Sequence, residues 1–389
     1  MPVECAMRVG VPKEIKNHEY RVGLTPQSVR ELAAHSHEVL VERGAGAGIG
    51  VCDEEYRAAG GVVIDTAEEI FRHAELIVKV KEPQAAERKQ LRAGQVLFTY
   101  LHLAPDPDQV KDLVASGVVA IAYETVTAEN GSLPLLAPMS EVAGRMAIQV
   151  AAHFLEKPHG GRGVLMSGAT GVAPARVAVL GAGVVGLNAT LVAAGMGADV
   201  VVLSPLTEQL RRLESQLESQ LGSQCCGRVR SMVSSSIAVE DAVRNADVVI
   251  GAALIPGALV PRLVTRAMLA SLRPGAVLVD VSIDQGGCFE TSRPTTHAEP
   301  TFVVDGILHY CVANMPGAVP RTSTYALNNA TLPFVVALAD HGWKSALQSD
   351  THLRNGLNIC CGRVTNRKVA EALGMESGMA WGDLDSAIA

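Results

Sequence analysis

The stretch RVAVLGAGVVGLNAT, residues 176–190, decides the fold of this chain. An apolar run typical of a buried strand leads into Gly181, Gly183 and Gly186, and a helical pattern follows at once. Gly181 can make the tight turn, Gly183 lets a pyrophosphate approach the backbone, and Gly186 lets helix and strand pack closely. In a glycine-rich chain this spacing alone is weak evidence. The strand before it and the helix after it make dinucleotide binding the preferred interpretation.

Further strands continue this unit toward the C-terminus. The runs ADVVVLS, ADVVIGAAL and AVLVDVSID are apolar and are separated by helical segments, which predicts a doubly wound parallel sheet. A long amphipathic helix over residues 141–156 and the glycine-rich link HGGRG precede the unit, and it closes between Tyr310 and Pro320. We therefore expect a Rossmann domain over residues 135–320.

The regions on either side predict a second α/β unit. From Met7 to Ala122, short β-branched runs alternate with stretches of helical period, which favours a parallel sheet covered by helices. Residues 321–389 have a mostly helical pattern and are too short for a core of their own. We expect them to pack on residues 1–134, so the predicted fold class is α/β with two domains.

Composition excludes several classes of protein. Apolar residues make up 48% of the chain, charged residues 19%, and the net charge of −7 comes from interspersed acids and bases with no basic stripe for nucleic acid. No apolar run is long enough for a membrane span, and the first residues lack a signal-peptide pattern. The 8 cysteines include no C-x-x-C pair, and no histidine stands at zinc-ligand spacing. We expect a cytoplasmic protein with reduced thiols, no metal site and no membrane partner.

The residue that ends the strand after the glycine turn bears on the choice of cofactor. An acidic residue at this point hydrogen-bonds the ribose hydroxyls of NAD and repels the 2′-phosphate of NADP. Ser204 occupies the position here, and no arginine follows it directly to hold a 2′-phosphate. NAD is favoured, with NADP or dual use left open.

Three polar segments point to chemistry beside the cofactor. Lys79 and Lys81 share one face of an expected strand, His102 follows an apolar strand, and Asp284 ends what we expect to be the last strand of the nucleotide domain. Alone, His102 is as compatible with a core histidine and Asp284 with a turn cap. Together they resemble a site for hydride transfer from an amino acid, which needs a cation for the carboxylate and a group that moves protons near neutral pH. Arg21 adds a second cation.

A series of segments spread over nearly the whole chain resembles one known family. In order, they are MRVGVPKEIKNHEYRVGLTP, KVKEP, LHLA, AYETV, LPLLAPMSEVAGRMA, GRGVLMSG, VLGAGVVG, VIGAALIPG, VDVSIDQGGCFETSRPTT, YCVANMPGAVPRTSTYALNNATLP and LADHGW. By these segments the chain resembles the alanine dehydrogenase family. The resemblance implies a Rossmann domain inserted into a discontinuous substrate domain, assembly as a homo-hexamer, and NAD(P)-dependent interconversion of L-alanine with pyruvate and ammonium.

Matched residue by residue, the resemblance implies roles for individual side chains. Arg21 and Lys81 would bind the substrate carboxylate, and His102 and Asp284 would transfer protons. Ser204 departs from the family's aspartate, and the polar stretch after Arg212 is longer than usual by about two helical turns. Cofactor contacts would fall on Ser140, Gly181, Gly183, Val184, Val185, Gly186, Ser204, Ser234, Ala253, Leu254, Val281, Ser282, Ile283, Asp284, Arg293, Val312, Ala313, Asn314 and Met315.

Three other functions remain open at this point. A dehydrogenase of another small amino acid or of glyoxylate would need the same cations and proton-transfer group. A non-catalytic NAD(P)-binding homologue is favoured only by Ser204, and Arg21, Lys81, His102 and Asp284 speak against it. The nucleotide-binding part of a proton-translocating transhydrogenase would not need an alanine pocket. The sequence also leaves the physiological direction of the reaction open.

Overall fold

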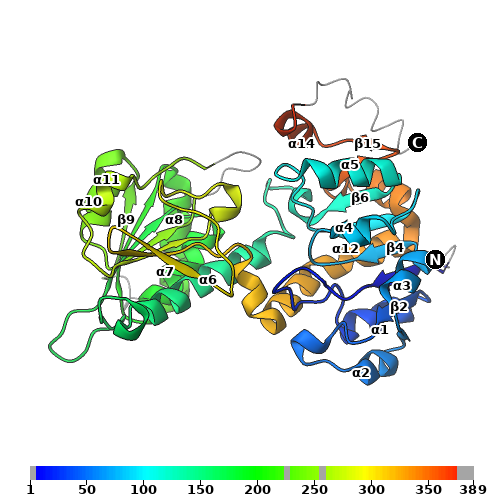
Figure 1. The fold of residues 1–389 in the computed structure, drawn as a ribbon, viewed down its shortest axis with the longest axis horizontal. Coiled ribbons are helices and arrows are strands. Elements are labelled where there is room, and N and C mark those ends of the chain that lie inside the picture. Colours follow the sequence, from blue (N-terminus) through cyan, green and yellow to red (C-terminus); the bar gives the residue numbers. More distant parts are fainter. Residues whose placement is uncertain (1–5, 223–227, 254–259, 375–389) are drawn as a thin grey trace. The chain divides into compact units, whose positions relative to one another are not determined.

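The computed structural model describes residues 6–222, 228–253 and 260–374, and the chain divides into two compact α/β units. Unit 1 comprises residues 1–139 and 317–389, and unit 2 comprises residues 140–316. Unit 2 is drawn mainly in green and yellow in Figure 1. The sequence analysis placed these boundaries a few residues away, at 134/135 and 320/321.

Unit 2 contains a seven-stranded sheet in the order β12-β13-β11-β10-β7-β8-β9. All neighbours are parallel except the β12–β13 pair, which confirms the doubly wound fold class. Its strands are β7 (Arg176–Leu180), β8 (Asp199–Ser204), β9 (Val229–Val233), β10 (Val248–Gly251), β11 (Val277–Asp280), β12 (Thr301–Val304) and β13 (Ile307–Tyr310). Its helices are α6 (Ala137–Phe154), which begins in unit 1, η3 (Lys157–His159), α7 (Val184–Gly195), α8 (Thr207–Leu221), α10 (Ser236–Arg244), α11 (Arg266–Leu269) and η4 (Ile283–Gln285).

The sheet of unit 2 does not end where the sequence analysis placed its end. Strand β11 pairs with a later strand, β13, and is therefore not the last strand of the sheet. The expectation that Asp284 ends the last strand was wrong, because Asp284 lies in η4. The missed signal was a hairpin turn. Asp305 and Gly306 both have positive φ, 52° and 79°, between β12 and β13, which suits the tight turn that Asp-Gly favours.

Unit 1 contains an eight-stranded sheet in the order β15-β14-β6-β5-β4-β1-β2-β3. Its strands are β1 (Arg8–Val11), β2 (Glu38–Glu42), β3 (Val62–Ile64), β4 (Leu76–Val78), β5 (Val96–Thr99), β6 (Val119–Ala122), β14 (Leu357–Cys360) and β15 (Arg363–Val364). Its helices are α1 (Pro26–Ala34), η1 (Ala47–Ile49), α2 (Asp53–Ala58), α3 (Ala67–His73), α4 (Ala85–Arg88), α5 (Pro107–Ser116), η2 (Tyr123–Thr125), α12 (Pro320–Ser349), α13 (Thr351–Arg354) and α14 (Arg367–Ala372), with η5 (Met315–Ala318) at the boundary.

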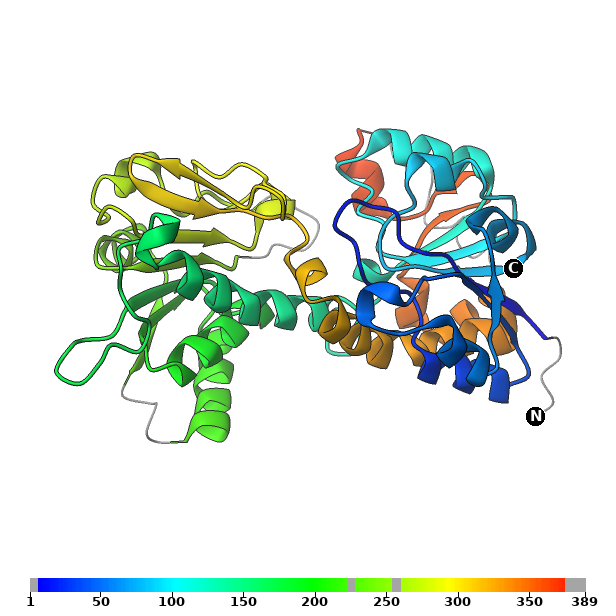
Figure 2. The same ribbon diagram turned by 60° about the horizontal axis from the view of Figure 1, so that its bottom comes forward.

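The C-terminal region completes unit 1 with strands as well as helices. Helix α12 lies beside α1 (Figure 2), and Asn328 accepts a hydrogen bond from the backbone N–H of Thr25 at 2.8 Å. Strand β14 then pairs antiparallel with β6. The sequence analysis expected mostly helix here, because a four-residue apolar strand is too short to show a period of its own.

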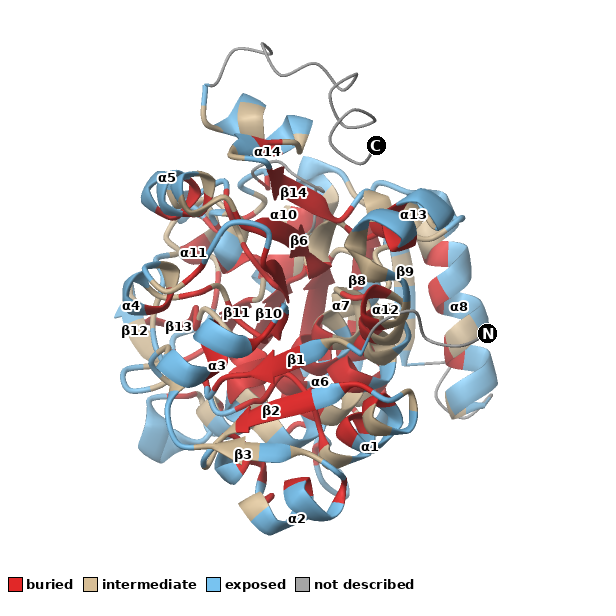
Figure 3. Cartoon of the chain, turned by 90° about the vertical axis from the view of Figure 1, so that its right-hand side faces the viewer, coloured by how far each residue is buried: buried red, intermediate tan, exposed pale blue. Residues whose placement is uncertain are grey.

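Buried residues are concentrated in the strands, as Figure 3 shows for β1, β2 and β6. Among the described residues, no helix combines the length and apolar content that a membrane crossing requires. Each sheet has a switch point, where the connections on the two sides of one strand run in opposite directions. In unit 1 this strand is β1, between β2 and β4, and in unit 2 it is β7, between β8 and β10. In open α/β sheets, ligands bind beyond the carboxyl ends of the strands at such a switch point.

The glycine turn of unit 2 has the geometry that its sequence predicts. Gly181 has φ of 118°, a conformation that favours glycine. A Cβ at Gly186 would lie 1.8 Å from the carbonyl oxygen of Gly181, so helix α7 can approach the turn only without a side chain at this position.

We therefore expect Gly186→Ala to destabilise unit 2 by about 1 to 3 kcal/mol, the usual cost of forcing a methyl group into packed structure. Gly195→Ala is the matched control, because it lies in the same helix and a Cβ there meets nothing within 4 Å. It should leave stability unchanged or raise it by about 0.4 to 1 kcal/mol. Urea unfolding of both variants measures the difference; equal stability would show that the close approach is not required.

Candidate active site

The cations predicted to bind the substrate carboxylate and the histidine predicted to transfer protons follow three neighbouring strands of unit 1. Arg21 lies in the connection after β1, Lys81 in the connection after β4, and His102 in the connection after β5. These strands are adjacent at the switch point of the sheet. The sequence analysis put Lys79 and Lys81 on a strand, but β4 ends at Val78 and both lysines lie just beyond it.

Arg21 is buried and is held by a carboxylate two residues away. Its side chain donates to Glu19 twice, from Nε at 2.7 Å and from Nη2 at 2.6 Å. Burial by itself would lower the pKa of Arg21, but the Glu19 carboxylate outweighs it and the pKa is raised. Nη1 lies 3.0 Å from Met139 Sδ, a weak acceptor that an incoming carboxylate can displace. The guanidinium is thus charged and fixed in orientation.

Lys79 and two glutamates form an ion cluster in the core beside this site. Lys79 Nζ is 3.1 Å from Glu14 Oε2 and 2.7 Å from Glu87 Oε1, and the Lys79 side chain is fully buried. Burial would lower the pKa of Lys79, yet the two carboxylates raise it overall. Burial also raises the pKa of Glu14, and the negative charges of Glu87 and Glu19 add to the rise, although Lys79 opposes it.

The same glutamate fixes the backbone that carries Lys81. Glu14 Oε1 accepts the backbone N–H of Val80 at 2.7 Å and that of Lys81 at 3.3 Å. The two lysines expected on one strand face therefore have different roles in the fold. Lys79 belongs to the ion cluster, and Lys81, which is 7% exposed, follows it in the connection.

His102 is held in an unusual backbone conformation by a second glutamate. Its φ is 48°, and Glu124 Oε1 accepts its backbone N–H at 2.7 Å and that of Leu101 at 3.1 Å. Burial raises the pKa of Glu124, although these N–H groups and Lys81 oppose the rise. The imidazole stacks on Tyr100 with ring centroids 5.8 Å apart. Non-glycine residues with positive φ are uncommon and concentrate at functional sites.

Sequence reasoning missed the carboxylates that position these side chains. Glu14 and Glu19 lie in the segment PKEIKNHEYR and Glu124 lies in AYETV, both of which were quoted for the resemblance without a role for their acids. An acid close to a candidate cation was the available signal for Glu19. No local pattern relates Glu14 to Lys79, since they meet only in the folded sheet.

The glycine turn of unit 2 offers a site for the phosphates of a dinucleotide. Helix α7 begins after Gly183, and no side chain caps its first N–H groups. A Cβ on Gly183 would meet nothing within 4 Å, so a ligand can approach the backbone there. Val184, at the first turn of the helix, is 41% exposed. Backbone N–H groups and the helix dipole together favour a phosphate at this end.

A buried aspartate organises the loop that follows β11. Asp280 accepts hydrogen bonds from the backbone N–H groups of Ser282 at 3.1 Å and Cys288 at 2.9 Å, and from the Ser292 hydroxyl at 2.5 Å. Burial raises the pKa of Asp280. This bonding arranges the predicted cofactor segment Val281–Asp284, within which Asp284 is exposed.

Ser204 ends β8 as expected, but its hydroxyl is already engaged. The side chain is fully buried, and Oγ donates to Gln209 Oε1 at 2.9 Å while accepting the Leu206 N–H at 3.2 Å. The serine thus shapes the turn into α8.

The remaining predicted cofactor residues lie in unit 2 in several connections. Ser282 Oγ donates to the carbonyl of Ala253 at 2.6 Å, and the Arg293 guanidinium stacks over Phe302 at 4.4 Å. Asn314 has φ of 68°, and its carbonyl is 3.1 Å from His297 Nε2. Leu254 lies outside the described residues. Ser140 is in α6, Ser234 follows β9, Val312 and Ala313 follow β13, and Met315 begins η5.

These features of unit 2 fit a dinucleotide. The cradle at Gly183 suits its pyrophosphate, and the turn joins a parallel strand to a helix at the switch point of the sheet. The structure therefore brings Arg21, Lys81 and His102 to neighbouring strand ends in unit 1 and the glycine turn and the Asp280-bonded loop to strand ends in unit 2.

Known proteins match this chain in sequence over nearly its whole length. The family model "Alanine dehydrogenase/PNT, N-terminal domain" matches residues 10–143, and "Alanine dehydrogenase/PNT, C-terminal domain" matches residues 147–367. An alanine dehydrogenase of Halomonas elongata is 58% identical over 95% of this chain and 98% of its own length. One of Mycobacterium tuberculosis is 52% identical over 95% and 97%, respectively.

Solved structures agree with these matches. A structure of an L-alanine dehydrogenase superposes with a TM-score of 0.88 at 48% identity, covering 95% of this chain and 99% of the other. A transhydrogenase from Sinorhizobium meliloti superposes with a TM-score of 0.78 at 25% identity, covering 92% and 99%.

The ion cluster around Lys79 should be essential for stability. Lys79→Met leaves two buried carboxylates without their cation, and we expect a loss of about 3 to 5 kcal/mol in the free energy of unfolding. Lys111→Met is the control: the exposed Lys111–Asp108 pair, at 3.4 Å, should contribute less than about 1 kcal/mol. Denaturant unfolding of both variants tests this, and a loss at Lys79 no larger than at Lys111 would contradict it.

Proposed function

The chain belongs to the alanine dehydrogenase/PNT family, and we propose that it catalyses the reversible NAD(P)-dependent oxidative deamination of L-alanine to pyruvate and ammonium. The observation that carries the proposal is the placement of Arg21, Lys81 and His102 at neighbouring strand ends of unit 1. Relatives that are about half identical over nearly the full chain are alanine dehydrogenases, which supports the same reaction here.

Substrate binding begins with the carboxylate of alanine. Arg21 and Lys81 supply the two positive charges for it, and the paired Glu19 keeps the guanidinium of Arg21 in one orientation. Planar guanidinium groups bind carboxylates with fixed geometry, which orients Cα as well as holding the molecule. Glu14 contributes at a distance by fixing the backbone of Lys81.

The chemical steps need a proton acceptor close to the substrate carbon. A bound oxidised nicotinamide would supply the acceptor for the hydride on Cα, and an alanine whose amino group has first lost a proton to solvent would then become an iminium. Water adds to the iminium carbon while His102 takes up one of its protons. The same imidazole returns that proton to the nitrogen, and ammonia leaves as the hydroxyl proton passes to solvent, which gives pyruvate. Glu124 holds His102 in place through its backbone N–H.

Other assignments rest on the resemblance. Asp284 is proposed as the second proton-transfer residue, and NAD as the preferred cofactor, with NADP possible because Ser204 stands in place of the ribose-binding acid. A homo-hexamer and a cytoplasmic location belong to the same proposal. The family match supports small-molecule substrates and a pyridine nucleotide.

The first test is the formation of reduced nicotinamide by purified protein with L-alanine and saturating NAD. We expect activity in the wild type, and a kcat lowered by about 10² to 10⁴ in His102→Ala, because proton transfer contributes this much. His102→Asn should be similarly impaired, since asparagine tolerates the positive φ at this position and so separates loss of the imidazole from backbone strain.

Two outcomes would overturn these assignments. Wild-type kcat in both His102 variants would remove the imidazole from the proton-transfer role. A protein that binds nucleotide but oxidises neither alanine, another small amino acid nor glyoxylate would be a non-catalytic homologue. Substrate preference is read from kcat/KM across that series.

Ser204 provides a test of cofactor choice. In Ser204→Asp a carboxylate would stand near the expected 2′-phosphate of NADP, so kcat/KM with NADP should fall at least about tenfold relative to NAD. Ser204→Ala is the control, because it removes the hydroxyl without adding charge. An unchanged NADP-to-NAD ratio in Ser204→Asp would show that residue 204 does not face the ribose.

A further inference from the structure

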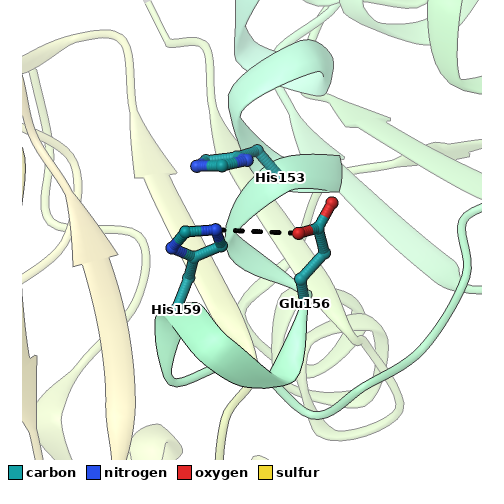
Figure 4. A group of neighbouring side chains, drawn as sticks. All are labelled: His153, Glu156 and His159. Carbon is teal, nitrogen blue, oxygen red and sulfur yellow. Dashed lines mark ion pairs between the residues drawn. The ribbon is translucent and has the colours of Figure 1, made fainter.

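A cluster of potential metal ligands lies in unit 2, outside the residues assigned to the reaction. His153 is in the last turn of α6, Glu156 precedes η3, and His159 is the last residue of η3. Each contributes one ligand atom, and these atoms all lie within 4.8 Å of one another. Figure 4 shows the two imidazoles on the same side of the turn, with the carboxylate reaching toward His159.

The backbone that carries the cluster is closed into a compact turn. The N–H of Glu156 donates to the His153 carbonyl at 3.2 Å, and that of His159 to the Glu156 carbonyl at 3.1 Å. Gly161 completes the turn by donating to Glu156 O at 3.1 Å, and a Cβ there would lie 2.2 Å from the Phe154 carbonyl oxygen. The three side chains therefore start from a fixed backbone.

Aromatic packing anchors the same turn on the sheet. Phe154 lies between the cluster and β13, with ring centroids 5.1 Å from His153, 6.0 Å from His159 and 5.7 Å from Tyr310. The two imidazoles are themselves close, with centroids 3.9 Å apart. Both imidazoles therefore lie on the Phe154 side of the turn, close to each other.

The spacing of the ligand atoms is close to what a metal needs. Zinc bonds to histidine nitrogen and carboxylate oxygen are about 2.0 to 2.2 Å long, which places tetrahedral ligand atoms about 3.3 to 3.5 Å apart. His159 Nε2 and Glu156 Oε2 are already 3.6 Å apart. Small rotations of these exposed side chains can bring the third ligand, from His153, to the same spacing.

We propose that His153, Glu156 and His159 form a binding site for a divalent transition-metal ion of the zinc or nickel class. Two imidazoles and one carboxylate suit these ions, whereas calcium and magnesium prefer all-oxygen sites. Three protein ligands leave further positions for water. A bound ion would join the end of α6 to η3 and stabilise this turn of unit 2.

This proposal departs from the expectation of no metal site, because the spacing H-x2-E-x2-H of these residues is not a common zinc pattern. On a continuous helix, residues six apart lie on different faces, since each residue advances the helix by about 100°. The cluster forms only because α6 ends at Phe154 and the chain turns.

The test uses untagged full-length protein with reduced thiols, titrated with ZnCl₂ or NiCl₂ against a chromogenic indicator. We expect one specific site per chain in the wild type, and at least tenfold weaker binding in His153→Gln and in His159→Gln, because even loss of a residue that only supports a ligand costs about 10- to 100-fold. His73→Gln, which changes an exposed histidine at the end of α3, is the matched control and should bind as the wild type does.

Thermal unfolding supplies a second readout. Zinc should raise the Tm of the wild type and of His73→Gln more than that of His153→Gln. Calcium at the same concentration should have no such effect. Equal zinc affinity and equal Tm shifts in all variants would overturn the proposal, as would a wild type that binds neither ion. Alanine oxidation assayed in chelator should be the same in all four proteins, so the outcome is independent of the proposed enzyme activity.

Discussion

Backbone N–H groups beyond the ends of parallel strands need acceptors, and this constraint governs both candidate binding regions. Within a sheet the next strand supplies the carbonyl, but past its end a connection has to find another partner or leave a buried donor unpaired. Carboxylates fill that role beyond three of the strands next to the candidate binding regions. Glu14 takes N–H groups after β4, Glu124 after β5, and Asp280 after β11.

Each of these carboxylates is buried, which destabilises its charged form, and each one fixes the backbone of a connection. Burial raises the pKa of all three, so the desolvation penalty on the charged form exceeds what the neighbouring N–H groups and cations offset. The connections that carry Lys81, His102 and Asp284 are therefore fixed by hydrogen bonds to buried carboxyl groups as well as by apolar packing.

The parts that sequence could predict are those in which a single residue type has a local geometric meaning. Gly181 needs positive φ and Gly186 needs the absence of a Cβ, so the turn was recognisable from its spacing and context. Ser204 was placed correctly at a strand end, yet its bond to Gln209 was not foreseeable. The Glu14–Lys79 contact spans 65 positions, and no local pattern encodes it.

Errors in the predicted fold concern one strand that only a distant partner identifies and one turn that is encoded locally. Strand β14 is identified by its partner β6, which lies more than 200 residues earlier, and its own four residues show no usable period. The hairpin of β12 and β13 was encoded locally, by Asp305 and Gly306, and could have been found.

The two units use one sheet topology for two kinds of recognition. In unit 2 the backbone of the glycine turn is available to a ligand, so the expected recognition of phosphate depends on N–H groups and on the absence of side chains at the glycines. In unit 1 the proposed recognition of the substrate carboxylate uses side-chain charges, and each cation is held by an acid of the protein: Arg21 by Glu19, and the segment of Lys81 by Glu14. Backbone recognition tolerates changes in the surrounding side chains, whereas recognition by paired charges depends on them. On the proposed function, a substitution among the buried acids of unit 1 is therefore expected to alter substrate binding even where the residue never contacts the substrate.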